Sequence, residues 1–137
     1  MAVGSAIYPR LGAVTSMHSP EAVLAANTVI IDPSTLRSGQ PFPLLPYIRI
    51  DADLSQGDWK IIIARAACRK CERRLSGGEC KPEGDERVAV VLAEEKKGWV
   101  LSKECEAVVG VLSPDKTWSF EAPLTVWLKD GRFLKAR

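Results

Sequence analysis

The sequence predicts a small single domain of the α+β class, mostly β, with a cysteine-rich insertion and an extended N-terminal segment. The chain of 137 residues is 46% apolar and 26% charged, so it can bury one core and has an ordinary globular composition. From residue 47 onward, short apolar and β-branched runs alternate with polar turns, as expected for a sheet. All four cysteines lie between residues 68 and 105, which marks the inserted element.

The N-terminal segment, residues 1–46, differs from the remainder because it is rich in proline. It holds six of the nine prolines, and a proline cannot donate a hydrogen bond inside a sheet. Residues 20–26 can form a short helix, and residues 28–31 can form a short strand. We interpret the segment as either a loop-rich lobe folded onto the domain or an arm that binds a partner. The arm would use five apolar anchors: Ile7, Tyr8, Phe42, Leu44 and Leu45.

The second region, residues 47–137, is the predicted β-rich core. Residues 47–50 alternate between apolar and polar side chains, as a half-buried strand does. Residues 59–65 have a continuous apolar centre, which indicates a strand covered on both faces. Residues 87–93 and 99–101 flank a charged turn, so we expect them to pair as a hairpin.

The last third of the chain combines an ambiguous stretch with a clear hairpin signal. Residues 102–112 place apolar side chains at helical spacing, but a glycine and three valines lower the helix propensity of this stretch. Farther on, Asp130-Gly131 stands between the apolar runs 124–128 and 132–134. An Asp-Gly pair between two such runs predicts a β-hairpin.

The cysteines have a spacing that is typical of a metal site. Cys68 and Cys71 form a two-residue knuckle directly after a predicted strand, and Cys80 and Cys105 follow it. A two-residue spacer lets both sulfurs of the knuckle reach one Zn²⁺ ion, and structural zinc favours four thiolates. The N-terminus has no basic start followed by an apolar segment, so we expect no secretory signal and a reducing compartment. We therefore predict one structural Zn²⁺ ion held by all four cysteines.

The predicted zinc-binding element, residues 68–112, resembles a known zinc motif. A cysteine knuckle, a β-hairpin and then a cysteine in the first turn of a helix resemble the treble-clef element. The resemblance implies a second ligand about three residues before Cys105, but this chain has Ser102 there. Cys80 would therefore have to supply the fourth thiolate from the preceding loop.

Three alternatives for the cysteines stay open. Cys80 and Cys105 can be buried free thiols, because unpaired cysteine often packs as a small apolar residue. The four cysteines can also form two disulfides, in any of three pairings. Finally, Cys68 and Cys71 can be a thioredoxin-like redox pair. That alternative requires the pair to open a helix of real length, whereas Ser76-Gly77-Gly78 follows closely.

Positive charge is concentrated around the knuckle. Residues 60–82 carry a net charge of +5, although the whole chain carries only +2. One interpretation is a solvated loop whose cations pair with nearby carboxylates, and the absence of aromatic residues from 61 to 98 favours it. The alternative is a nucleic-acid-binding surface whose cations contact phosphates. That surface would use Lys60, Arg65, Arg69, Lys70, Arg73, Arg74 and Lys81.

Catalytic residue sets are scarce in the sequence. The only histidine is His18, no glycine loop for phosphate is present, and a four-thiolate zinc site has no open coordination position. We therefore expect a non-catalytic structural or adaptor protein that docks, as part of an oligomer, with other protein subunits in a multi-protein complex or a virion. A nucleic-acid-binding zinc protein is the alternative. No apolar run approaches the ~20 residues that span a bilayer, so we expect a cytoplasmic or virion location without a membrane partner.

Overall fold

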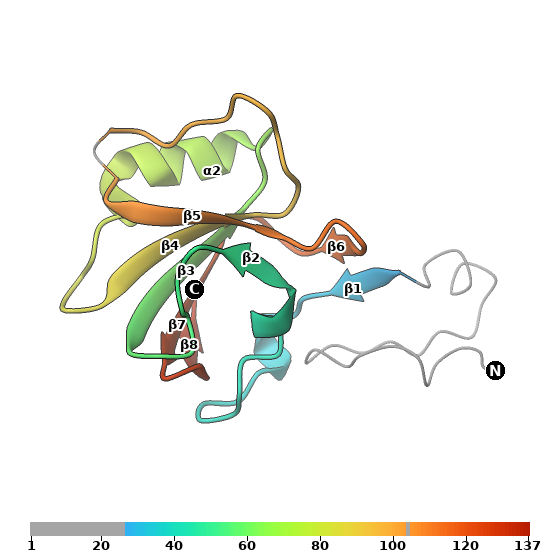
Figure 1. Cartoon of the computed structure of the whole chain (residues 1–137), viewed down its shortest axis with the longest axis vertical. Helices are drawn as coiled ribbons and strands as arrows, with labels where there is room; N and C mark the ends of the chain where they lie inside the picture. Colours follow the sequence, from blue (N-terminus) through green and yellow to red (C-terminus); the bar gives the residue numbers. More distant parts are fainter. Residues whose placement is uncertain (1–26, 104) are drawn as a thin grey trace.

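The computed structural model describes residues 27–103 and 105–137, and β-structure dominates them. Six strands form a mixed sheet in the order β2-β5-β4-β3-β7-β8, and two form a small parallel sheet, β1-β6 (Figure 1). The strands are β1 Thr28–Ile30, β2 Ile48–Ile50, β3 Asp58–Ala64, β4 Arg87–Leu92, β5 Ala107–Leu112, β6 Thr117–Ser119, β7 Leu124–Lys129 and β8 Arg132–Ala136. The helical elements are η2 Pro33–Thr35, η3 Leu45–Tyr47, α2 Arg69–Arg74 and η4 Leu75–Glu79. The predicted α+β, mostly β fold class is confirmed.

Strand β3 lies at the centre of the large sheet because its side chains are apolar on both faces. Ile61 and Ile63 belong to one face and Ile62 and Ala64 to the other, and all four are fully buried. Strand β4 runs parallel to β3 on one side, and β7 runs antiparallel to it on the other. Parallel neighbours need a crossover connection, and α2 and η4 supply it across one face of the sheet (Figure 1). The strand predicted at residues 59–65 is thus confirmed.

Different parts of the chain cover the two faces of the sheet. On the helical side, Leu75 and Cys80 pack against Ile62, Val88 and Val90. On the opposite side, residues from the N-terminal segment and from β6 join the strands in one larger core. That core is formed mainly by Val29, Ile31, Leu36, Phe42, Leu44, Leu54, Trp59, Ile61, Ile63, Val91, Leu112, Trp118, Leu124, Val126, Leu128 and Phe133.

The proposed arm residues that the structure describes belong to this core. Phe42 is 2% exposed, Leu44 is 0% exposed, and Leu45 is half-buried against the same cluster. The prediction that these three side chains are exposed anchors for a partner is therefore wrong. Their apolar side chains instead cover the face of the sheet opposite α2. Ile7, Tyr8 and the helix predicted at residues 20–26 lie outside the described residues.

Backbone hydrogen bonds attach this proline-rich stretch to the edge of the sheet. The Phe42 N–H donates to the Gly131 carbonyl (2.9 Å), and the Gly39 N–H donates to the Phe133 carbonyl (2.7 Å). Pro41 lies opposite Arg132 in an isolated bridge. An edge position tolerates prolines because the chain makes only scattered ladder bonds there. Farther upstream, the predicted strand at residues 28–31 is confirmed as β1, which pairs with β6.

The helix that the treble-clef resemblance requires near residues 102–112 is absent from the described residues. Strand β5 takes its place, parallel to β4 and antiparallel to β2. Residues 99–101 lie in a loop, so the predicted hairpin between them and residues 87–93 is also wrong. Gly110 explains part of this outcome. A Cβ atom there would lie 2.7 Å from the Ile50 Cβ, so β2 can approach β5 only because residue 110 has no side chain.

The C-terminal hairpin agrees with its sequence signal. Strands β7 and β8 are antiparallel and are joined by Asp130 and Gly131. Both residues have a positive φ, 49° and 80°, as the two central positions of a type I′ turn require. The hairpin places Leu124, Val126 and Leu128 in the main core and positions Thr125 on the helical side of the sheet.

Candidate functional site

Cys68 and Cys71 lie where the chain from β3 enters helix α2. Cys68 is the N-cap residue and has an extended backbone (φ −123°, ψ 113°), and Cys71 is in the first turn. The Cys71 N–H donates to the Cys68 Sγ over 3.1 Å. The two residues form a disulfide with a Cα–Cα distance of 5.2 Å. The cysteine pair therefore opens the helix of a β3-α2-β4 crossover unit.

The two sulfurs of this pair differ in their access to solvent. Cys71 is 1% exposed and packs with Ala64 and Leu92 beneath the start of the helix. Cys68 is only partly buried at the edge of the same cluster, beside Trp99 and Ala122. Cys68 is therefore the more solvent-accessible residue of the pair.

Helix α2, behind the pair, is short: it has six residues, Arg69–Arg74. After α2, the chain continues through the turn of π-helix η4, in which Gly78 adopts a left-handed conformation with φ 98°. The helical run is kinked at Gly78, so the expectation that Ser76-Gly77-Gly78 interrupts the helix soon after the cysteine pair agrees with the structure. The argument for a redox pair therefore rests on the position of the two cysteines and not on the length of the helix.

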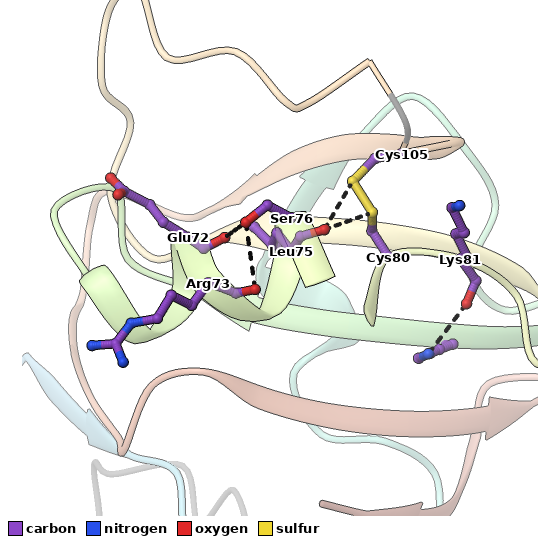
Figure 2. Close-up of a disulfide and its surroundings, with 8 residues drawn as sticks. Glu72, Arg73, Leu75, Ser76, Cys80, Lys81 and Cys105 are labelled. Carbon is purple, nitrogen blue, oxygen red and sulfur yellow. Dashed lines mark hydrogen bonds between the residues drawn. A yellow bond between two sulfur atoms is a disulfide. The ribbon is translucent and has the colours of Figure 1, made fainter. Parts of the chain in front are cut away.

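The second disulfide joins Cys80, at the end of η4, to Cys105, in the loop before β5 (Figure 2). Its sulfurs lie 3.3 and 3.6 Å from the carbonyl oxygen of Leu75. Cys80 is fully buried, and Cys105 is partly buried in the same apolar cluster. This disulfide thus ties the helical layer to a loop that is 25 residues away in sequence.

The predicted zinc site requires four sulfurs at one point, and the structure divides them into two pairs. Cys71 and Cys80 belong to separate apolar clusters, and Trp99 packs against both. Among residues 27–103 and 105–137, no group of three or more His, Cys, Asp or Glu side chains is placed to hold a metal ion. The observed pairing is one of the three disulfide patterns left open by the sequence. Zinc binding by the reduced thiols stays a prediction.

The predicted basic patch is divided as well. Lys60 is 1% exposed, and its Nζ lies 2.9 Å from a carboxylate oxygen of Glu83. Arg65 pairs with Glu94 at 2.8 Å and stacks over an aromatic ring. These two cations are therefore occupied within their own domain. Of the remaining five, Arg69 and Lys81 are exposed, and three line a hollow beside α2: Lys70, Arg73 and Arg74.

A network of charged and polar side chains surrounds Glu79 at the end of η4, whereas the Cys68–Cys71 pair lies at the start of α2. Glu79 accepts hydrogen bonds from Arg137 (2.8 Å) and from the buried hydroxyl of Thr125 (3.0 Å). Burial acts to raise the pKa of Glu79, but these hydrogen bonds and the charges of Arg137 and Lys60 lower it overall. The same contact with Glu79 raises the pKa of Arg137. The network connects η4 to Thr125 of β7 and to Arg137, the residue after β8.

Comparisons of the chain with protein-family models, with curated proteins and with solved structures gave no match. The candidate site therefore rests on geometry. Within the described part of the chain, no helix is long and apolar enough to cross a membrane. Sequence reasoning missed two residues beside the cysteine pair, Trp99 and Ala122, because only the folded chain brings them there.

Proposed function

We propose that this chain is a thiol–disulfide exchange protein whose working pair is Cys68 and Cys71. The observation that carries the proposal is the placement of a Cys-x-x-Cys pair at the start of a helix between two parallel strands. A Cys-x-x-Cys pair near a βαβ unit is typical of thioredoxin-like redox motifs. The unequal exposure of the two sulfurs also fits, because exchange needs one accessible sulfur and one protected sulfur.

In the reduced protein, the Cys68 thiolate is the nucleophile. It attacks one sulfur of a partner disulfide and forms a mixed disulfide, and the other partner sulfur leaves as a thiolate. The Cys71 N–H, 3.1 Å from the Cys68 Sγ, donates to the developing thiolate and favours its ionised form. Cys68 is therefore the group that a partner touches first.

Cys71 completes the exchange. Its thiolate attacks the Cys68 sulfur of the mixed disulfide, so the Cys68–Cys71 disulfide forms and the partner is released as a dithiol. Two electrons pass from the protein dithiol to the partner disulfide. Because Cys71 is buried against Ala64 and Leu92, it meets the mixed disulfide from inside and is shielded from competing solvent thiols. A dithiol reductant returns the protein to its starting state.

The non-catalytic adaptor with a structural zinc ion, expected from the sequence, stays a competing prediction. It assigns the same four cysteines to a metal, whereas the exchange proposal assigns them to two disulfides with separate roles. Two observations support the exchange proposal over the zinc site. The four cysteines form two separate disulfides, and one of them, Cys68–Cys71, lies at the start of helix α2. Metal content and exchange activity distinguish the two proposals.

The test is reduction of insulin disulfides with dithiothreitol as the electron source. We expect the wild-type chain to accelerate the reaction and Cys68→Ser to abolish the acceleration. Cys71→Ser should trap a mixed disulfide through Cys68, which mass spectrometry detects after the thiols are blocked. A wild-type chain that neither accelerates the reaction nor forms the trapped species in its Cys71→Ser variant would refute the proposal.

A further inference from the structure

A hollow of about 670 Å³ lies beside helix α2, the helix that the Cys68–Cys71 pair opens. Helix α2, the end of β1 and the residues before β7 form its walls. Ala122 both lines the hollow and packs against the cysteine cluster, and Lys70 stands between the two cysteines in the helix. The volume falls within the range of ligand pockets, roughly 300–1,000 Å³. A molecule in this hollow therefore contacts helix α2 at Lys70, the residue before Cys71.

The rim of the hollow carries charges of both signs. Four cations line it, against two carboxylates, Asp32 and Glu121. Two of the cations are already engaged, since Arg137 and Arg74 lie 2.8 and 3.9 Å from Glu79. Lys70 and Arg73 are exposed, and no carboxylate of the described residues lies within ion-pair distance of either. Two cations are thus available to a ligand.

The rest of the hollow is apolar. Ile30, which is 38% exposed, lines it together with Ile31, Pro33, Pro123 and Leu124. An apolar wall beside paired cations suits a peptide that carries both apolar and acidic side chains. It suits a nucleic-acid backbone less well, because Lys60 is buried, Arg65 is paired with Glu94, and two carboxylates share the rim.

We propose that this hollow selects partner proteins with an acidic segment beside the disulfide that they exchange. The proposal rests on the exchange function of Cys68 and Cys71. Lys70 and Arg73 pair with carboxylates of the partner, which orients its disulfide toward Cys68 and raises the rate of encounter. Residues 1–26 of this chain do not match this chemistry, because they contain a single Glu and a single Arg. The occupant is therefore a partner protein.

The test compares two synthetic peptides of equal length, each closed by one disulfide. One carries Glu residues beside the disulfide, and the other carries Gln at the same positions. The second-order rate constant for exchange is measured with the reduced full chain. We expect the Glu peptide to react roughly three- to tenfold faster than the Gln peptide, and the difference to shrink at about 0.5 M salt.

Variants of the chain separate the hollow from general charge effects. Lys70→Gln/Arg73→Gln should bring the ratio of the rate with the Glu peptide to the rate with the Gln peptide close to one. Lys81→Gln/Lys129→Gln removes the same charge from exposed positions that do not line the hollow, so it should keep the preference.

Three outcomes overturn the inference, and each leads to a different conclusion. Equal rates with both peptides for the wild-type chain mean that exchange occurs without acidic selection. No exchange with either peptide removes the proposed function itself. Salt-dependent binding of a single-stranded oligonucleotide that Lys70→Gln/Arg73→Gln abolishes, without any preference between the peptides, assigns the hollow to nucleic acid.

Discussion

The two disulfides close loops of very different length, and this predicts that only one of them stabilises the fold strongly. Cys80 and Cys105 are 25 residues apart in sequence, whereas Cys68 and Cys71 are 3 residues apart. In the chain-entropy account, the longer loop corresponds to about 3.5 kcal/mol of stabilisation and the shorter loop to about 1.5 kcal/mol. Removing the Cys80–Cys105 disulfide should therefore lower the free energy of unfolding by about 2 kcal/mol more than removing the Cys68–Cys71 disulfide.

Two double variants measure this difference: Cys80→Ala/Cys105→Ala and Cys68→Ala/Cys71→Ala. They are well matched, because each pair contains one cysteine that is at most 1% exposed and one that is partly buried. The packing lost with the sulfur atoms is therefore similar, and the loop length dominates the comparison. Urea unfolding gives the free energies, and we expect the midpoint of the first variant to lie roughly 1 M below that of the second.

Exchange activity provides the second half of the experiment. Cys80→Ala/Cys105→Ala should retain insulin reduction at temperatures where it is folded, and Cys68→Ala/Cys71→Ala should lose it. Equal stability of the two variants would refute the assignment of Cys80–Cys105 as the stabilising disulfide. Loss of activity in the folded Cys80→Ala/Cys105→Ala variant would show that the two pairs do not have separate roles.

Three further predictions concern the N-terminal segment, the charge network and metal binding. Leu44→Ala should lower the free energy of unfolding by about 2–5 kcal/mol because Leu44 is fully buried. A chain that begins at Tyr47 should not fold, and a truncated chain that does fold would restore the arm interpretation. Burial acts to raise the pKa of Glu79, but the hydrogen bonds from Arg137 and Thr125 lower this pKa below 4.5 overall. The carboxylate of Glu79 therefore stabilises the folded state above about pH 4.5, and this stabilisation is lost as the pH falls through the folded-state pKa. Glu79→Gln should therefore flatten the pH dependence of urea unfolding below about pH 4.5, and an unchanged slope would contradict the network. The reduced chain dialysed against Zn²⁺ should retain no stoichiometric metal by atomic absorption, whereas one ion per chain would support the single zinc site predicted from the sequence.

Local patterns in the sequence predicted the central and C-terminal strands well. The apolar run at residues 59–65 indicates a strand covered on both faces, and β3 is such a strand. Asp130-Gly131 predicts a hairpin because a two-residue type I′ turn requires a positive φ at both positions, and Asp and Gly adopt it readily. This signal depends only on the two residues of the turn. Such features need no knowledge of the rest of the chain.

The errors came from elements whose state depends on distant residues. In the stretch at residues 107–112, the apolar spacing favours a helix and the valines favour a strand. The stretch forms a strand because it pairs with β4 on one side and with β2 on the other. Phe42 and Leu44 lie in a stretch without a periodic apolar pattern. They are buried because they cover the face of the sheet opposite α2, which the local sequence does not reveal. For the cysteines, spacing alone does not distinguish a metal from a disulfide. Their pairing depends on how the helical layer and the loop before β5 meet.

The order of the cysteines along the chain has a consequence for biosynthesis. A ribosome makes Cys68, Cys71 and Cys80 before Cys105, so for a time Cys80 can pair only with Cys68 or Cys71. Ala122, which packs against the cluster around Cys71, is made later still. Oxidation of the nascent chain can therefore form a wrong bond to Cys80. Correct pairing of Cys80 requires a free thiol, or an isomerase, until Cys105 has been made.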